Sequence, residues 1–202
     1  MLKLSEIELK IKVDNFIWNY KVGDNIKHNI EDIIILYEYK NNSSSVRNGK
    51  IFNKYISIIY VSLIEAMLYD FVVRLSEATT EFPKDIQYEK KLNIKNYLSK
   101  QKVSYKSNNR ERATLLRVRN YSLAQIIKFL QDFELLEKAN HNVYLDLNKI
   151  AIFRNRIHIY NWYGNFEKDE RNLYTDTRLL SVEKYFLYVL NTLESRYSRP
   201  KW

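Results

Sequence analysis

A short stretch in the last quarter of the chain brings together an arginine, an amide and an imidazole. Residues 153–160 read Phe-Arg-Asn-Arg-Ile-His-Ile-Tyr, and His158 is one of three histidines among 202 residues. If this stretch is helical, Arg154 and His158 lie four positions apart and share one face. A guanidinium holds phosphate oxygens in pairs, and an imidazole titrates near neutral pH and moves protons. The spacing therefore predicts a site for phosphate chemistry.

Cleavage of RNA is one reaction that groups of these types can support. It requires removal of a proton from a 2′-hydroxyl, in-line attack on phosphorus and protonation of the leaving oxygen. His158 would act as base or acid, Arg154 would stabilise charge on the phosphate, and Asn155 would orient the phosphate or hold the imidazole tautomer. One histidine supplies half of the proton transfer, so a two-fold dimer that pairs two such helices would supply the rest.

Positive charge is concentrated in one segment. The net charge is +9, and ten basic residues with a single acid lie between Lys90 and Asn120, whereas the rest of the chain carries 23 of each sign. Such a patch on a neutral body predicts a polyanion as partner, and a solvated basic loop is the alternative. The residues expected to follow an RNA backbone are Lys95, Lys100, Lys102, Lys106, Arg110, Arg112, Arg117 and Arg119.

The composition predicts an all-α protein. Three glycines and two prolines are too few for the many turns of a sheet protein. The absence of cysteine excludes disulfides, zinc ribbons, iron–sulfur clusters and thiol nucleophiles. The three histidines lack the spacing of metal ligands and there is no Gly-rich phosphate loop, so we expect neither a metal nor a cofactor. Residues 1–6 lack the apolar core of a signal peptide, and polar residues interrupt Ile56–Val73, so a buried helix and a cytoplasmic location are expected.

Hydrophobic periodicity predicts six or seven helices in one bundle. The first forty residues read as two helices with a break at Gly23-Asp24-Asn25, followed by a polar linker at 41–45. We expect 1–45 to form a helical layer or arm and 46–202 to form the bundle. Ser122 and Gln125 form a capping-box pattern that opens a helix. The main helices are expected at 51–78, 121–138, 143–158 and 177–197, with a loop at 104–109.

Two helical faces connect these elements to the site. On helix 51–78 one stripe contains Ile51, Tyr55, Ile58, Ser62, Glu65 and Tyr69, and Glu65 is expected to face inward as an ion-pair partner for Arg154. On helix 143–158 a second face contains Leu147, Ile150, Ala151, Arg154 and His158.

The long helix with Ile58–Leu68 and the later Phe153–His158 motif together resemble the HEPN superfamily of small all-helical domains. The resemblance covers roughly residues 50–195. It implies a metal-independent ribonuclease of toxin or defence type and a homodimer with the motif at its interface. The family signature is an arginine, often followed by asparagine, and then a histidine after four to six intervening residues. Here three residues intervene.

Tyr160 adds a second point of resemblance. Some toxins of this family carry a tyrosine two positions past the histidine, and a partner nucleotidyltransferase adds AMP to it. Tyr160 matches that position, which implies an antitoxin or nucleotidyltransferase partner.

Other interpretations remain open at this stage. The shortened motif fits a non-catalytic helical module that binds RNA or protein, with Arg154 and His158 as satisfied polar groups in the core. The basic segment also suits recognition of duplex DNA. The aromatic cluster that follows His158 would either stack on exposed RNA bases or cover the end of the bundle; it contains Tyr160, Trp162, Tyr163 and Phe166.

Overall fold

The computed structural model describes residues 5–77, 88–100, 102–107, 110–116, 121–136, 141–155 and 173–198. These residues form seven helices and one two-stranded antiparallel sheet. The elements are α1 (Glu6–Phe16), α2 (Tyr20–Asn42), α3 (Val46–Glu77), α4 (Tyr88–Lys100), β1 (Lys102–Ser107), β2 (Arg110–Leu116), α5 (Leu123–Asp132), α6 (His141–Asn155) and α7 (Asp176–Tyr197). The predicted all-α architecture with one long central helix is confirmed.

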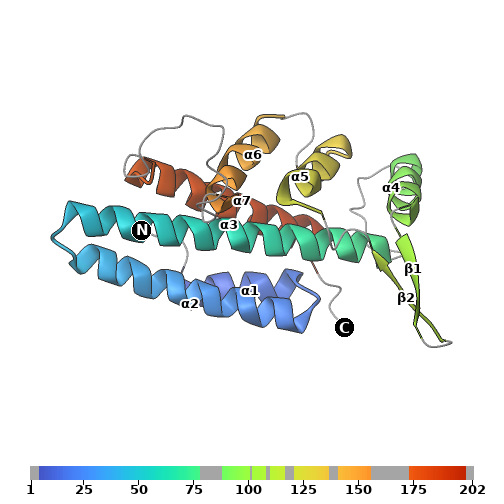
Figure 1. Cartoon of the computed structure of the whole chain (residues 1–202), viewed down its shortest axis with the longest axis horizontal. Coiled ribbons are helices and arrows are strands. Elements are labelled where there is room, and N and C mark those ends of the chain that lie inside the picture. The colour runs from blue at the N-terminus through green and yellow to red at the C-terminus, as the bar shows by residue number, and fades with distance from the viewer. Residues whose placement is uncertain are drawn as a thin grey trace.

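Helix α3, 32 residues long, forms the axis of the molecule. In Figure 1, α1 and α2 lie on one side of α3 and α5 and α6 lie on the other, while α7 runs alongside α3 and also contacts α1. Helix α4 and the hairpin lie at the C-terminal end of α3. All seven helices contribute side chains to one hydrophobic core, so α1 and α2 pack on the same core as the later helices.

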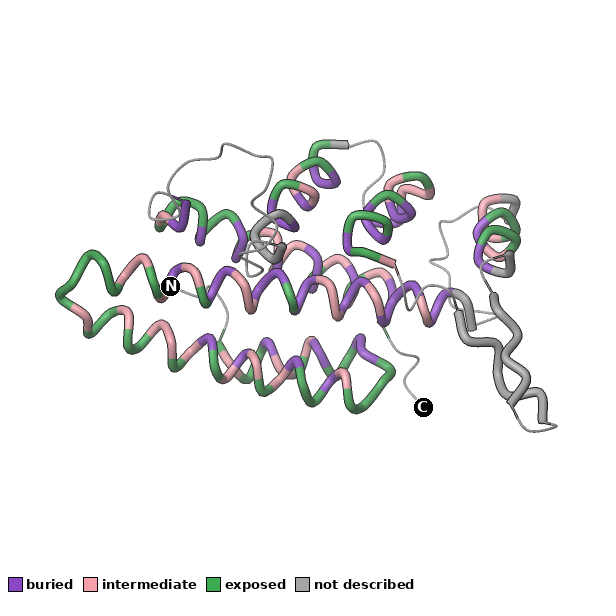
Figure 2. Tube along the Cα trace, viewed as in Figure 1, coloured by how far each residue is buried: buried purple, intermediate pink, exposed green. Residues whose placement is uncertain are grey.

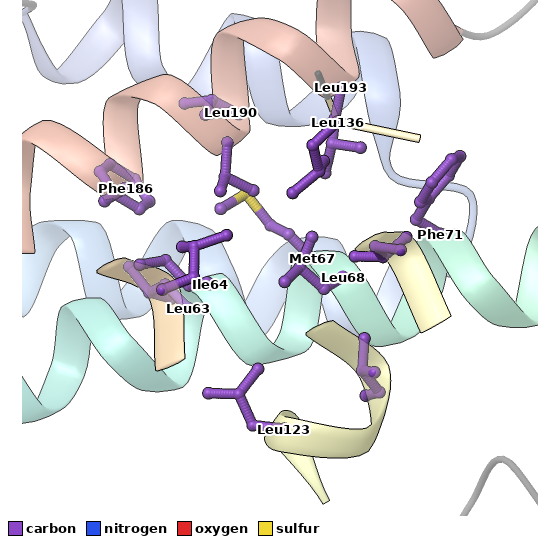
Figure 3. Packing of buried hydrophobic residues seen from close by; sticks show 14 of the residues in the cluster. Leu63, Ile64, Met67, Leu68, Phe71, Leu123, Leu136, Phe186, Leu190 and Leu193 are labelled. Atoms are coloured by element: carbon purple, nitrogen blue, oxygen red, sulfur yellow. The ribbon is translucent and has the colours of Figure 1, made fainter. Parts of the chain in front are cut away.

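The core-facing side of α3 is almost completely dry. Ile56, Tyr60, Ile64, Met67 and Phe71 are each at most 1% exposed, and buried positions recur along the helix after its first two turns in Figure 2. Figure 3 shows Met67 within a cluster to which α5 and α7 also contribute, through Leu123, Phe186, Leu190 and Leu193. Full burial of one such side chain contributes about 1.5–3 kcal/mol.

The stripe noted on helix 51–78 lies mostly at the surface over its first half. Ile51 and Tyr55 are 43% and 53% exposed. Ser62 is also exposed, while Glu65 and Tyr69 are half-buried. A helix that is apolar over most of its circumference has no unique stripe, so the neighbours α2 and α7 determine which side is buried.

The first two helices separate at residues 17–19, earlier than the predicted break at Gly23-Asp24-Asn25. Asn19 is the N-cap of α2, and its side-chain oxygen accepts hydrogen bonds from the backbone N–H groups of Lys21 (3.1 Å) and Val22 (3.3 Å). Because the cap lies at Asn19, Gly23 falls inside the first turns of α2 and does not interrupt the helix.

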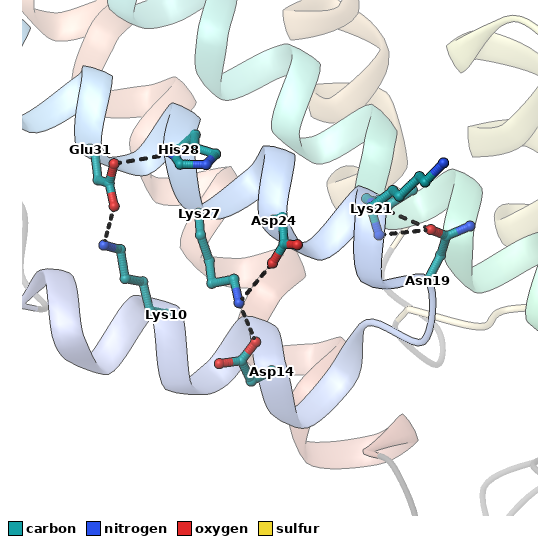
Figure 4. Close-up of polar contacts among 9 residues, drawn as sticks. Lys10, Asp14, Asn19, Lys21, Asp24, Lys27, His28 and Glu31 are labelled. Atoms are coloured by element: carbon teal, nitrogen blue, oxygen red, sulfur yellow. Dashed lines mark hydrogen bonds and ion pairs between the residues drawn. The ribbon is translucent and has the colours of Figure 1, made fainter.

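Ion pairs hold α1 and α2 alongside each other (Figure 4). Lys27 on α2 lies 3.0 Å from Asp14 on α1 and 3.2 Å from Asp24. Lys10 pairs with Glu31. The carboxylate of Glu31 raises the pKa of Lys10, and the ammonium of Lys10 lowers the pKa of Glu31. These groups are partly exposed to solvent, so the ion pairs contribute little to stability and mainly align the two helices.

Two buried charged residues of α3 fasten the ends of other helices. Arg74 is 4% exposed and donates hydrogen bonds to the carbonyl oxygens of Phe16 (2.9 Å) and Tyr197 (2.8 Å), the last residues of α1 and α7. One turn earlier, Asp70 accepts from the backbone N–H groups of Trp18 (3.3 Å) and Asn19 (3.4 Å). A cation at helix C-termini and a carboxylate at a helix N-terminus both complement the helix dipoles.

Helix α3 is long and apolar enough over Val46–Leu75 to cross a membrane. However, 61% of its most apolar window is buried inside the protein. Its polar residues Asn53, Asp70 and Arg74 bond to the backbone of other parts of the chain. These features are those of a helix buried in a protein core, as expected for Ile56–Val73.

Helix α5 begins at the predicted capping box and ends earlier than predicted. Ser122 accepts from the backbone N–H of Gln125, whose side chain accepts from the backbone of Ser122. The helix ends at Asp132 because Glu134 adopts a left-handed conformation with φ of 47°. The backbone N–H of Leu135 then bonds to the carbonyl of Leu130 at 2.9 Å, which closes a Schellman-type turn.

The predicted loop at 104–109 is wrong for residues 104–107, which belong to β1. The antiparallel register pairs Val103 with Leu115, Tyr105 with Arg112 and Ser107 with Arg110, with an irregularity between Val103 and Tyr105. Tertiary hydrogen bonding between the two strands therefore outweighs the loop-like composition of this segment.

Candidate functional site

Helix α6 carries the first part of the predicted catalytic motif. Its face with Tyr144, Leu147, Ile150 and Ala151 is at most 8% exposed. This face packs against α3 and α5, which set the rotation of α6 about its axis. The predicted apolar face of helix 143–158 is confirmed as far as Ala151.

Polar contacts fix α6 further. The hydroxyl of Tyr144 accepts a hydrogen bond from the backbone N–H of Leu136 at 3.2 Å. On the opposite side, Asp146 accepts a hydrogen bond from the Tyr185 hydroxyl of α7. The neighbouring Lys149 ammonium at 2.7 Å and this hydroxyl lower the pKa of the Asp146 carboxyl. Burial raises the pKa of Tyr185 to about 12, and Asp146 adds to the shift.

The segment that precedes α6 is also anchored. The backbone carbonyls of Leu135 and Leu136 accept hydrogen bonds from Arg196 at 3.1 and 3.0 Å. The hydroxyl of Tyr197 bonds to the Leu135 carbonyl at 2.8 Å. The C-terminal end of α7 thus positions the chain just before the helix that bears the motif.

Arg154 and Asn155 are the last two residues of α6 in the described part of the chain. Arg154 follows Ile150 by four positions and Ala151 by three, so it lies on the core-packed side of the helix. Asn155 lies one position further round. His158 and Tyr160 fall outside the described residues, and their predicted roles stay predictions.

The predicted Glu65–Arg154 ion pair also stays a prediction. Glu65 is half-buried on α3, which packs against α6. The backbone of Arg154 is described but its side chain is not. Among the residues that the structure describes, no group of three or more His, Cys, Asp or Glu residues is arranged to hold a metal ion.

The predicted RNA-binding residues divide between a helix and the hairpin. Lys95 lies half-buried on α4, and Lys100 is the last residue of that helix. Lys102, Lys106, Arg110 and Arg112 lie on β1 and β2. Arg117 and Arg119 fall outside the described residues.

Helix α4, which directly precedes the hairpin in the chain, packs against α5. Ile94 and Leu98 are at most 1% exposed. The ring of Tyr97 lies 5.4 Å from Phe129 and 5.7 Å from Phe133, measured between centroids. These contacts attach α4 to α5, so the hairpin starts from a packed helix.

The structure does not bring the two predicted site components together within one chain. Along the long axis of the molecule, Figure 1 shows the order α6, α5, α4 and then the hairpin. Lys102–Ser107 and Arg110–Leu116 therefore lie at one end, away from Arg154 and Asn155. An RNA that contacted both would have to extend along the molecule or across a dimer.

One residue of the hairpin was absent from the predicted RNA-binding set. Tyr105 lies directly opposite Arg112 across the two strands. The alternation of polar and apolar residues over Lys102–Lys106 was the sequence signal for a strand, and the neighbouring Ser-Asn-Asn obscured it. An aromatic beside an arginine suits contact with exposed bases.

The comparisons with known proteins neither support nor contradict the HEPN resemblance, which is based on residues 50–195 of the sequence. No protein-family model, no curated protein and no solved structure matches the chain.

Proposed function

We propose that the protein is a metal-independent endoribonuclease of toxin or defence type that acts in the cytoplasm. The observation that carries the proposal is the Arg154-Asn155 pair at the last described turn of a firmly anchored helix, with His158 three residues further along. Arg154 binds the scissile phosphate, His158 transfers protons, and Asn155 orients the phosphate or holds the imidazole tautomer. The HEPN resemblance adds support through the same three residues.

A homodimer belongs to this proposal. A single imidazole completes one of the two proton transfers in RNA cleavage. Two copies of the motif, related by a two-fold axis, supply a base and an acid at one cleft. Tyr160 is then a candidate acceptor of AMP from a nucleotidyltransferase partner.

The proposal is tested by incubating the protein with a labelled single-stranded RNA in EDTA. We expect cleavage that leaves cyclic-phosphate ends. His158→Ala and Arg154→Ala should abolish it while leaving the helical circular dichroism unchanged. Full activity in either variant would contradict the assignment.

Matched controls are available in the described part of the chain. His28 is 74% exposed on α2 and pairs with Glu31, so His28→Ala removes an imidazole far from the motif. Arg47 is exposed near the start of α3, so Arg47→Ala removes a guanidinium. Both controls should cleave RNA at the wild-type rate.

One observation favours a second candidate function. Arg154 follows Ile150 by four positions and Ala151 by three, both of which are buried, and an arginine at such a position can hold helices together. In that case the protein is a non-catalytic module that binds RNA or protein. Binding of RNA without any cleavage, together with lower thermal stability of Arg154→Ala, would support this function over the first.

A further inference from the structure

The hairpin of β1 and β2 is an arm with its own chemistry. In Figure 1 it extends away from the helices beyond the end of α3. Its strands lie chiefly against each other and contact the rest of the described chain little. An isolated two-stranded hairpin is at best marginally stable in water, so a partner that binds it would also stabilise it.

The register of the hairpin separates its charged residues. Residues directly opposite each other lie on the same face, and successive residues alternate between faces. Tyr105 pairs with Arg112 and Ser107 pairs with Arg110, whereas Lys106 pairs with Glu111 between them. Arg110, Arg112 and Tyr105 therefore share one face, which we name the Arg–Tyr face.

The two faces differ in net charge. Lys106 and Glu111 are of opposite charge and lie directly opposite each other, so their face is close to neutral at this level. The Arg–Tyr face has two guanidiniums and no carboxylate within β1 and β2. An anion is therefore attracted to one side of the hairpin more than to the other.

An irregularity divides the hairpin into two parts. Between Val103 and Tyr105 the register shifts, so β2 contributes one residue more than β1. The inner part pairs Val103 with Leu115, and the outer part carries the Arg–Tyr face. Bulges of this type bend a strand and change the direction of the residues beyond them.

We propose that the Arg–Tyr face binds single-stranded RNA that flanks the cleaved phosphate, an inference that rests on the proposed ribonuclease function. Arg110 and Arg112 are two positions apart on one strand, about 6.8 Å, which is comparable to the separation of neighbouring phosphates. Guanidinium planes and a tyrosine ring both stack on unpaired bases. In a duplex the base faces are already stacked, so Tyr105 would contribute little. Because the hairpin lies far from α6, which carries Arg154, the RNA on the hairpin would be nucleotides that flank the cleaved phosphate.

The experiment compares two charge-matched double variants in a His158→Ala background, so that the RNA stays intact. Arg110→Ser/Arg112→Ser removes two positive charges from the Arg–Tyr face, and Lys21→Ser/Lys128→Ser removes two from exposed positions of α2 and α5. Binding of fluorescein-labelled oligo(U) is measured by anisotropy over a series of KCl concentrations. Circular dichroism confirms that each variant keeps its helices.

We expect the arginine variant to lose at least tenfold in affinity and the slope of log K against log salt to fall by about 1.4. The lysine variant should lose less than threefold, because neither lysine belongs to the hairpin. Tyr105→Leu should weaken binding of oligo(U) by about tenfold and leave the binding of an RNA duplex unchanged. Equal losses in the two double variants would reduce the effect to net charge and overturn the proposal.

Two further outcomes separate this inference from the proposed function. Tighter binding of duplex than of oligo(U), unaffected by Tyr105→Leu, would overturn the inference even if the wild-type protein cleaves RNA. Selective loss of oligo(U) binding in the arginine variant would support it even if the protein with intact His158 cleaves nothing. In a cleaving enzyme the arginine variant should raise KM and leave kcat unchanged, because its contact lies away from the reacting phosphate.

Discussion

The Tyr185 hydroxyl of α7 donates a hydrogen bond to the Asp146 carboxylate of α6. This contact joins the helix that carries Arg154 to the last helix of the bundle. It lies on the half-exposed side of α6, opposite the apolar face that packs on α3. The orientation of the motif helix thus depends on one polar contact as well as on apolar packing.

Tyr185→Phe should lower the free energy of unfolding by about 1 kcal/mol at pH 7. The pKa of Asp146 is lowered by Lys149 first and by Tyr185 second, so the stabilisation is present above the ordinary carboxyl pKa of 3.8 and is lost as the pH falls through the folded value. A urea-unfolding double-mutant cycle with Asp146→Asn should show a coupling that shrinks in acid. A coupling unchanged between pH 7 and acid would contradict the role of the ionised carboxylate.

Arg74→Met should destabilise the protein by about 3 kcal/mol, because the carbonyls of Phe16 and Tyr197 lose a buried charged donor. Arg47→Met provides the same substitution at an exposed position of the same helix and should change stability by less than about 0.5 kcal/mol. Thermal unfolding by circular dichroism measures both. Similar effects of the two substitutions would show that the buried contacts contribute nothing.

Tyr37→Phe should lower the free energy of unfolding by about 2 kcal/mol. The substitution removes the hydroxyl that donates a hydrogen bond of 2.9 Å to the buried Glu183 carboxylate. Burial raises the pKa of Tyr37 and Glu183 adds to this, so the hydroxyl keeps its proton over the whole neutral range. Tyr39→Phe, at a position of α2 that is 62% exposed, is the control and should be close to neutral. Urea midpoints that coincide for the two variants would count against the buried pair.

Glu134→Gly should raise the free energy of unfolding by about 1 kcal/mol, because the left-handed conformation at φ 47° costs any residue with a Cβ atom. The variant loses the ion pair with Lys90 at 3.0 Å, but both side chains are partly exposed and the loss is small. Glu134→Val, which is worse suited to this conformation, should lower stability. A glycine variant less stable than the wild type would mean that the ion pair outweighs the backbone strain.

Local signals in the sequence were reliable where one short-range interaction decides the structure. Ser122 and Gln125 predicted the capping box that the structure contains, and the last helix was expected at 177–197 and runs from Asp176 to Tyr197. The break near residue 20 was misplaced because Gly23 is a strong signal on its own, while the cap at Asn19 is decided by backbone geometry.

Features that depend on distant partners were not predictable in the same way. The buried side of α3 is determined by α2 and α7, so the exposure of Tyr55 and Ser62 did not follow from helical spacing alone. Glu183 reads as an ordinary surface charge until Tyr37 of α2 lies beside it. For the candidate site, the sequence alone placed Arg154 and Asn155 on the motif helix. That Arg110 and Arg112 share one face of the hairpin follows only from the register of its two strands.

The guanidinium of Arg74 holds the final carbonyl of α1 and the final carbonyl of α7 at once. Neither helix can fray from its end without exposing the same buried cation, so the first and last helices of the bundle open together. Their terminal amide protons should accordingly exchange with deuterium at one common rate, although 180 residues of chain separate the two contacts.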